Sequence, residues 1–193
     1  SYNWPDLVTQ DGQKQNHYLA VNGASKNTHY HFGVGYNREE GVYKNDLQNR
    51  YNMKGSVDSK INKYLSAGFS LNLAYTENQY ASDDAVKDAY RQVPFARPYD
   101  ADGNYNVKPG NYEAFGTKAN QFTDSVNPLI YLRDDSKESN TFRVLGNIYV
   151  QLKPVNWLSF KTTFSPNYVN SRTGEYTSSS GSRTETASHE EYT

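Results

Sequence analysis

The histidines and carboxylates of the chain are the first candidates for metal or acid–base chemistry. Only four histidines are present, His17, His29, His31 and His189, and there is no cysteine to supply a thiolate ligand. His29 and His31 are two residues apart, so on a strand they share a face and could offer two imidazole ligands. The sequence places no third ligand beside them. Solvated histidines are the favoured interpretation, and we predict neither a metal site nor another cofactor.

A second pattern, DADGN at residues 100–104, opens like a calcium-binding loop. The twelfth position of that motif, a bidentate glutamate, falls on Asn111, so the match fails at its decisive ligand. Asp102-Gly103 is better interpreted as a type I′ turn between two short extended segments. The sequence also contains no nucleophile elbow, no ordered catalytic triad and no glycine-rich phosphate loop. We therefore predict that the protein is not an enzyme.

Aromatic and basic side chains in one long segment are the remaining candidates for binding chemistry. Rings on loop tips can stack on sugars or contact a partner protein. Self-packing of the loop explains the same residues equally well, and the adjacent Asp134-Asp135 indicate a solvated turn rather than an acid–base pair. The candidates for ligand or partner binding are Tyr99, Tyr105, Tyr112, Phe115, Arg97 and Arg133.

The composition limits what kind of protein could carry these groups. Over 193 residues the mean hydropathy is -0.93 and 35% of residues are hydrophobic, yet 15% are aromatic and 18 are tyrosine. Abundant aromatics and a net charge of -1 argue against disorder of the whole chain. Near-neutral charge also removes the electrostatic case for nucleic acid. No apolar run approaches the roughly 20 residues of a membrane helix, so average hydropathy alone indicates a soluble protein.

Alternation of apolar and polar residues dominates wherever the sequence is periodic. Between residues 15 and 168, about six segments of roughly ten residues each have one apolar and one strongly polar face. The predicted fold class is all-β, an antiparallel up-and-down meander. The apolar positions, which would face lipid in a membrane barrel, are Phe32, Val34, Met53, Val57, Phe69, Leu71, Leu73, Val144, Ile148 and Val150. On the opposite face, Asn52, Lys54, Asp58, Ser70 and Asn72 would line a hydrated lumen.

The connections between these strands alternate in length. Residues 23–27, 61–64 and 153–157 are short connections, whereas 38–49, 77–140 and the segment from 171 are long. If the strands run up and down, every short turn falls at one end and every long loop at the other. Outer-membrane barrels are built this way, whereas soluble sandwiches follow no such rule. The 77–140 loop is predicted to be extracellular and to contain a short helix over 82–93.

An internal repeat places an aromatic residue at two of the short turns. The spacing from Arg50 to Tyr64 recurs from Arg143 to Trp157, at an offset of 93, and the apolar face is preserved. In a barrel, Tyr64 and Trp157 would lie in the interface girdle, with their rings at the headgroup layer. In a soluble protein the same residues could cap the edge of a core. The alternation of loop lengths favours the girdle.

About six strands are too few for a closed membrane barrel, whose minimum is about eight. An open sheet in lipid would leave edge backbone groups unpaired, at several kcal/mol each. The chain also starts SYNWP, without an initiator methionine or a leader-like segment. We therefore expect a partial outer-membrane β-barrel, with a lead-in (1–14), barrel strands one to four (15–76), the long loop (77–140), strands five and six (141–170) and the start of a further loop (171–193).

Short motifs in order along the chain resemble SusC/RagA-like TonB-dependent outer-membrane transporters of Bacteroidetes. NWPDL (3–7) and QNHYLAVNGAS (15–25) are similar to the motif that leads into that family's barrel. Further similar segments are YHFGVGY (30–36), EGV (40–42), RYN (50–52), NPLI (127–130) and RVLGNIYV (143–150). The resemblance covers nearly the whole chain. Family members are much longer, and the plug domain and TonB box that they carry have no counterpart in this sequence.

The resemblance implies a location in the bacterial outer membrane and a role in a nutrient importer that takes up glycans or peptides. These strands would be the first after the plug, and membrane lipid would surround them. For the full-length protein, the resemblance implies energy from TonB and a SusD-like surface lipoprotein over the loops. The alternative is a soluble extracellular carbohydrate-binding or adhesin-like β-domain that binds through its tyrosine-rich loops.

Overall fold

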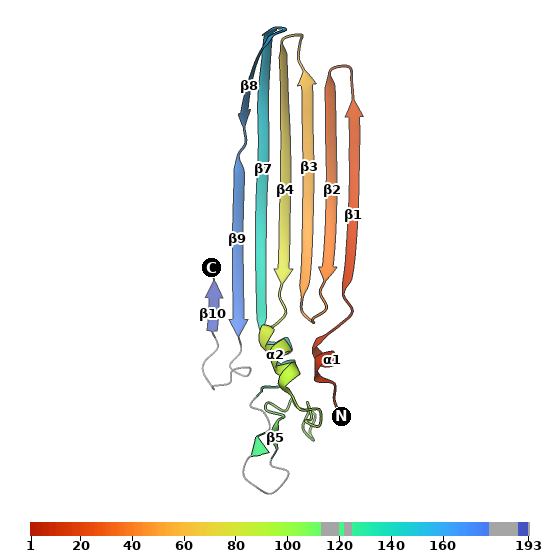
Figure 1. The fold of residues 1–193 in the computed structure, drawn as a ribbon, viewed down its shortest axis with the longest axis vertical. Coiled ribbons are helices and arrows are strands. Elements are labelled where there is room, and N and C mark those ends of the chain that lie inside the picture. Colours follow the sequence, from red (N-terminus) through yellow and green to blue (C-terminus); the bar gives the residue numbers. More distant parts are fainter. Residues whose placement is uncertain (113–119, 122–124, 178–188, 193) are drawn as a thin grey trace.

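The computed structural model describes residues 1–112, 120–121, 125–177 and 189–192, and most of them form one antiparallel sheet (Figure 1). Its first strands are β1 (Gln13–Ala24), β2 (Thr28–Glu40), β3 (Leu47–Lys60), β4 (Leu65–Gln79) and β7 (Ser136–Val155). After them come β8 (Leu158–Phe164), β9 (Asn167–Thr177) and β10 (His189–Tyr192). The order in the sheet is β1-β2-β3-β4-β7-β9-β10, with β8 also paired to β7. The predicted antiparallel meander is confirmed, and the sheet is open in the part of the chain described.

β8 and β9 together correspond to the sixth predicted strand. Both pair with β7, β8 with its second half and β9 with its first, and the register is unchanged across the break. Pro166 lies at the break because proline has no N–H to donate to the opposing strand. Its carbonyl still accepts from the N–H of Gly146 at 2.9 Å. The sixth strand is therefore one strand interrupted at a single residue.

All the short turns lie at one end of the sheet and the longer connections at the other (Figure 1). Residues 25–27, 61–64 and 156–157 form the short turns, and residues 41–46 and 80–135 connect strands at the opposite end. The predicted alternation is confirmed, but the connection expected over 38–49 is shorter. The charged run at 38–40, which looked like a loop, continues the β2–β3 ladder as far as the Glu40–Leu47 pair.

At the long-loop end, residues 1–10, 41–46 and the described part of 80–135 form a cluster that we call the cap. It contains α1 (Trp4–Val8), α2 (Asp83–Arg91), α3 (Pro128–Asp134) and the paired short strands β5 (Asn111–Tyr112) and β6 (Asn120–Gln121). α2 confirms the helix predicted over 82–93, and the side chain of its N-cap, Ser82, accepts from the N–H of Ala85. None of the helices described is long and apolar enough to cross a membrane.

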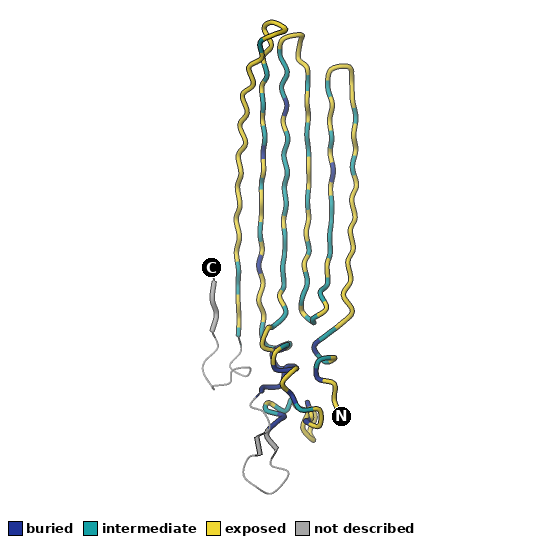
Figure 2. The backbone as a smooth tube through the Cα atoms, viewed as in Figure 1, coloured by how far each residue is buried: buried dark blue, intermediate teal, exposed yellow. Residues whose placement is uncertain are grey.

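The buried hydrophobic residues lie in the cap and not in the sheet (Figure 2). One cluster joins Trp4 and Val8 of α1 to Ala89 of α2 and to Ala96. A second joins α2 to α3, and its members are Ala85, Val126, Ile130 and Tyr131. The sheet is a single layer, so within the residues described its apolar side chains have no second layer to pack against.

Candidate functional site

Strand register gathers the apolar side chains onto one side of the sheet, which we call the apolar face. Directly opposed residues of antiparallel strands project to the same side. One row across the sheet consists of Leu19, Val34, Met53, Leu73 and Val144. Neighbouring rows add Phe32 with Leu71, then Val57 with Phe69 and Ile148, then Ala67 with Val150. Every position predicted to face lipid lies on this face, whereas the contact with lipid itself stays a prediction.

The height of the apolar face can be estimated along β4. Its apolar positions run from Leu65 to Tyr75 in alternation. At about 3.4 Å per residue this stretch is about 34 Å long, and with a strand tilt of about 40° its height is about 26 Å. The apolar band of outer-membrane barrels is about 25 Å tall. The face therefore has the height that a bilayer requires.

Aromatic side chains border the apolar face near the cap, and the predicted girdle at the short-turn end stays a prediction. Tyr36, Tyr51 and Tyr75 are paired across β2, β3 and β4 near the cap, and their neighbouring ring centroids are 5.1 and 6.4 Å apart. At the short-turn end, Tyr64 and Trp157, the predicted girdle residues, are 45% and 84% exposed. Local sequence does not reveal the tyrosine row, because its members come together only when the strand register is known.

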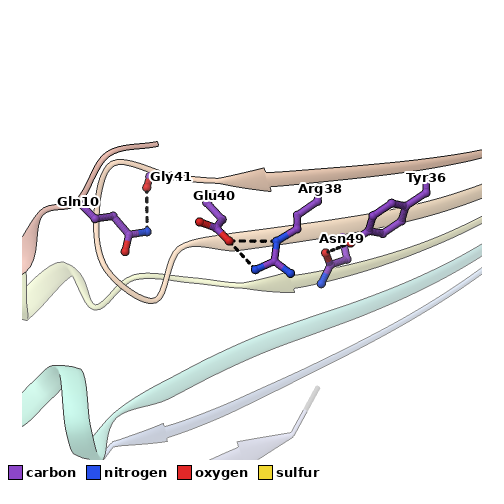
Figure 3. A network of polar contacts seen from close by, with 6 residues as sticks. All are labelled: Gln10, Tyr36, Arg38, Glu40, Gly41 and Asn49. Atoms are coloured by element: carbon purple, nitrogen blue, oxygen red, sulfur yellow. Dashed lines mark hydrogen bonds and ion pairs between the residues drawn. The ribbon is translucent and has the colours of Figure 1, made fainter. Parts of the chain in front are cut away.

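Beyond the tyrosine row the strand ends become polar (Figure 3). The hydroxyl of Tyr36 donates to Asn49 Oδ1 at 3.1 Å, and Arg38 Nε donates to Glu40 at 3.0 Å. Tyr36 therefore presents its ring to the other rings and its hydroxyl to polar groups. Interfacial tyrosines are placed in this way, with one end in an apolar and the other in a wet environment.

The opposite side of the sheet, the polar face, carries hydrogen-bonded side chains. Tyr149 donates through its hydroxyl to Asp58 Oδ1 at 2.7 Å, and Lys161 Nζ lies 4.4 Å from the centre of the Tyr149 ring. The ring crosses Gly68, where a Cβ atom would lie 2.1 Å from Tyr149 Cε1. The residues predicted to line a lumen share this face: Asn52, Lys54, Asp58, Ser70 and Asn72.

The two histidines of β2 also lie on the polar face, as their spacing predicted. His31 uses both ring nitrogens, since Nδ1 contacts Asn22 Oδ1 and Nε2 lies 3.3 Å from the hydroxyl of Tyr18. His29 lies opposite Asp58 in the neighbouring strand. No group of three His, Cys, Asp or Glu side chains in the described part of the chain could hold a metal ion. His31 has a hydrogen-bonding role in this arrangement.

Three of the predicted binding residues meet in the cap. The rings of Tyr99 and Tyr105 stack with centroids 5.4 Å apart, and the guanidinium carbon of Arg133 lies 4.9 Å from the centre of the Tyr105 ring. Tyr105 also packs against the α2–α3 core, while Tyr99 is 47% exposed. The carboxylate of Asp134 accepts from Arg133 Nη2 at 2.7 Å, and this hydrogen bonding raises the pKa of the Arg133 guanidinium. The cluster is thus partly self-packed and partly exposed.

The other predicted binding residues do not join this cluster. The backbone carbonyl of Arg97 accepts from Asn106 Nδ2 at 3.3 Å. Tyr112 belongs to β5, but its side chain is not among the described groups, and Phe115 lies outside the described residues. Their roles in binding stay predictions.

The turn expected at Asp102-Gly103 forms, but with another geometry. The flanking segments make an antiparallel bridge, and the N–H of Asp100 donates to the carbonyl of Asn104 at 2.9 Å. Gly103 has a φ of +86°, whereas Asp102 has no positive φ, and a type I′ turn needs both. The predicted turn type is therefore wrong. The carboxylate of Asp100 accepts from the N–H groups of Asp102 and Asn104, at 3.0 and 2.8 Å, and this Asx-type bonding sets the local backbone.

Buried polar side chains hold the cap together, and they were not among the residues predicted from the sequence. Asp88 on α2 is fully buried and accepts from the N–H of Val126 at 3.2 Å and from the hydroxyl of Tyr131 at 3.1 Å. Asn127 is fully buried as the N-cap of α3. The signal for Asp88 was its place on the same helical face as Ala85 and Ala89. The signal for α3 was a capping residue followed by proline.

Curated relatives of the chain are TonB-dependent receptors. TonB-dependent receptor P26 of Formosa agariphila is 27% identical over 176 residues, which cover 91% of this chain and 17% of the relative. TonB-dependent receptor SusC of Bacteroides thetaiotaomicron is 23% identical over 164 residues, covering 78% of this chain and 16% of the relative. The chain therefore spans less than a fifth of the length of these relatives. No family model matches the chain.

Solved structures of the RagAB peptide importer have the same fold. The closed-closed and open-open states align with TM-scores of 0.68 and 0.69, each at 18% identity, covering 90% of this chain and 19% of that chain. The fold is thus a partial antiparallel β-barrel of the TonB-dependent receptor type. The resemblance found in the sequence motifs is confirmed, since the chain is similar to a segment of SusC/RagA-like TonB-dependent receptors.

Proposed function

We propose that the chain forms part of the barrel wall of a nutrient importer in the bacterial outer membrane. The apolar face carries this proposal, because at the strand tilt of outer-membrane barrels it is about 26 Å high, has a tyrosine row along its cap end and has no protein layer over it within the described residues. In this role, lipid acyl chains cover the apolar face and the polar face lines a hydrated lumen. The similarity to TonB-dependent receptors and to the solved RagAB peptide importer supports a role in import.

For the full-length protein we propose TonB-driven uptake of glycans or peptides, with a SusD-like surface lipoprotein over the cap. The relatives named SusC and RagAB peptide importer support this assignment. The cap lies opposite the short turns, and in outer-membrane barrels that end is extracellular. The proposed contacts with ligand or lipoprotein are Tyr99, Tyr105, Tyr112, Phe115, Arg97 and Arg133.

The alternative of a soluble carbohydrate-binding or adhesin-like β-domain has less support. Such a domain would bury the apolar face of its sheet against a second sheet. The buried hydrophobic residues of this chain, as far as it is described, lie in the cap instead.

Arginine substitutions on neighbouring residues of β4 test the lipid-facing wall. Leu71→Arg places a charge at mid-height of the apolar face and should lower the free energy of unfolding in lipid vesicles by about 2–4 kcal/mol. Asn72→Arg, one residue further along on the polar face, should change it by less than about 1 kcal/mol. Both variants are made in the full-length protein and measured by guanidinium unfolding. Equal losses in the two variants would contradict the proposal.

A further inference from the structure

The short-turn end of the sheet has a one-sided charge. Its turns and adjoining strand ends, residues 22–31, 57–68 and 149–163, contain a single acidic residue, Asp58. The same segments contain the lysines Lys26, Lys60, Lys63, Lys153 and Lys161. The excess of positive charge means that this end attracts negatively charged partners.

These lysines have no acidic partner among the residues described. The ion pairs among the described residues lie in or near the cap, at the other end of the sheet. They are Lys14–Glu39, Arg38–Glu40, Lys87–Asp84, Arg133–Asp134 and Lys137–Glu175. The one acid at the short-turn end, Asp58, accepts a hydrogen bond from Tyr149. Positive charge at this end is therefore uncompensated by the wall itself.

Two of the lysines, Lys26 and Lys63, lie in the short turns themselves, and we call them the rim lysines. Lys63 Nζ lies 4.7 Å from the centre of the Tyr64 ring, and the N–H of Lys153 donates to the carbonyl of Tyr64 at 2.7 Å. Rim lysines and girdle aromatics therefore stand at the same level. Lys60, Lys153 and Lys161 differ, because strand register and alternation place them on the polar face with Gln151.

We propose that the rim lysines bind the phosphate groups of anionic phospholipids in the leaflet around the short-turn end. This inference rests on the lipid-facing wall proposed above. A lysine stem can lie along apolar surface while its ammonium reaches the headgroups, and basic residues beside a membrane attract anionic lipid. Aromatic residues of the girdle lie at headgroup level. Because the rim lysines accompany these aromatics, a lipid surface fits them better than an acidic protein segment in the lumen.

Two variants of the full-length protein test the assignment. K26Q/K63Q removes the rim lysines, and K60Q/K161Q removes the same number of charges from the polar face as a matched control. Each protein is reconstituted in nanodiscs of mixed phosphatidylglycerol and phosphatidylcholine, and the lipids retained after extraction are counted by native mass spectrometry. The rim variant should lose its preference for phosphatidylglycerol by about tenfold or more, since each basic residue at an anionic surface contributes about fivefold. The control should keep the preference.

A bimane probe on Phe69→Cys separates this inference from the proposed wall, because its quenching by brominated acyl chains reports lipid contact of the apolar face alone. Quenching together with an unchanged preference in the rim variant would overturn the rim-lysine proposal and leave the wall intact. Loss of the preference in the control as well would show that total positive charge, and not the position of the rim lysines, sets the preference, against our proposal. An unquenched probe would contradict both proposals.

Discussion

Asp88 shows how one buried carboxylate can organise a loop. Its Oδ2 accepts from the backbone of Val126 and from the hydroxyl of Tyr131, so it joins α2 to the segment that begins α3. Two buried donors depend on the same side chain. A buried donor that loses its acceptor costs about 1–3 kcal/mol, which makes Asp88 a larger contributor to the cap than the exposed ion pairs around it.

Replacing Asp88 with alanine should loosen the cap locally. We expect the opening free energy at the Val126 amide to fall by about 1–3 kcal/mol, measured by hydrogen exchange. Lys87→Ala, on the exposed side of the same helix, should change it by less than about 0.5 kcal/mol. Equal protection of the Val126 amide in both variants would show that Asp88 does not hold the segment.

Gly68 is a position where a side chain has no room. Gly68→Val should destabilise the sheet by about 1–3 kcal/mol, because the new Cβ would meet the Tyr149 ring, which must then leave Asp58. Gly55→Val is the matched control, since the nearest heavy atom to a Cβ at Gly55 is Phe32 Cδ2 at 4.0 Å. Denaturant midpoints of the two variants in vesicles provide the measurement. When each variant is combined with Tyr149→Ala, most of the difference in stability between Gly68→Val and Gly55→Val should disappear. A difference that persists would show that a clash with the Tyr149 ring is not its cause.

Which face a strand residue occupies could be predicted, but its neighbours could not. Alternation is a local property of the chain, so Phe32 and Val57 could be assigned to the apolar face from sequence alone. The row of Tyr36, Tyr51 and Tyr75 depends on register, which three separate segments determine together. Asp88 was missed because an acidic residue in a short helix is ordinarily solvated, and only the tertiary contacts bury it.

Among the elements, the β8–β9 strand has a defect that a substitution can repair. Gly146 and Pro166 lie opposite each other in the ladder, and the N–H of Gly146 donates to the carbonyl of Pro166. Pro166 has no N–H that could donate in return to the carbonyl of Gly146. Pro166→Val would supply the missing donor to Gly146 and should strengthen the local pairing by about 0.5–1.5 kcal/mol. Hydrogen exchange of the β9 amides measures this. Asn167→Val, which changes strand propensity but adds no donor, is the control, and equal gains in both would exclude the ladder bond as the cause.

The long elements were easier to predict than their ends. Period-two alternation over many residues identifies β2, β3, β4 and β7, whereas the polar run at 38–40 hid the last residues of β2. α2 has both a capping serine and acidic residues in its first turn, so it could be predicted. α1 and α3 are short, and burial in the cap rather than local periodicity determines them.

At the scale of the whole molecule, α1 ties the start of the chain to the middle of the long loop. Trp4 is 1% exposed, and its Nε1 donates to the carbonyl of Val93, 89 residues away, at 3.1 Å. Lys44 of the neighbouring connection donates to the carbonyl of Leu7 at 3.0 Å. Three segments that are distant in sequence thus share one small core. Contacts between residues so far apart have no signature in local sequence. For this reason the strands of the wall could be predicted, whereas the packing of the cap could not.

Trp4→Ala should release the cap without disturbing the sheet. Removing a buried tryptophan costs about 3–5 kcal/mol, so residues 80–135 should become more sensitive to limited proteolysis. The amides of β3, which pair with β2 and β4, should keep their exchange protection. Tyr2→Ala, at a residue that is 43% exposed, serves as the control. Loss of protection throughout the sheet would show that cap and wall unfold as one unit.

The cap also bears on how the wall is assembled. β4 and β7 are joined in register from Gln79–Glu138 onward, although all of residues 80–135 lie between them along the chain. Closing so long a loop carries an entropy cost that grows with the length of flexible chain, and such non-local pairing is slow. A cap that has already folded around α2 and α3 holds the ends of the loop near each other and shortens the chain that still has to be ordered. We therefore expect β4 and β7 to pair first beside the cap and then progressively towards the short turns. In that order of assembly, the folded cap nucleates the pairing of the two strands.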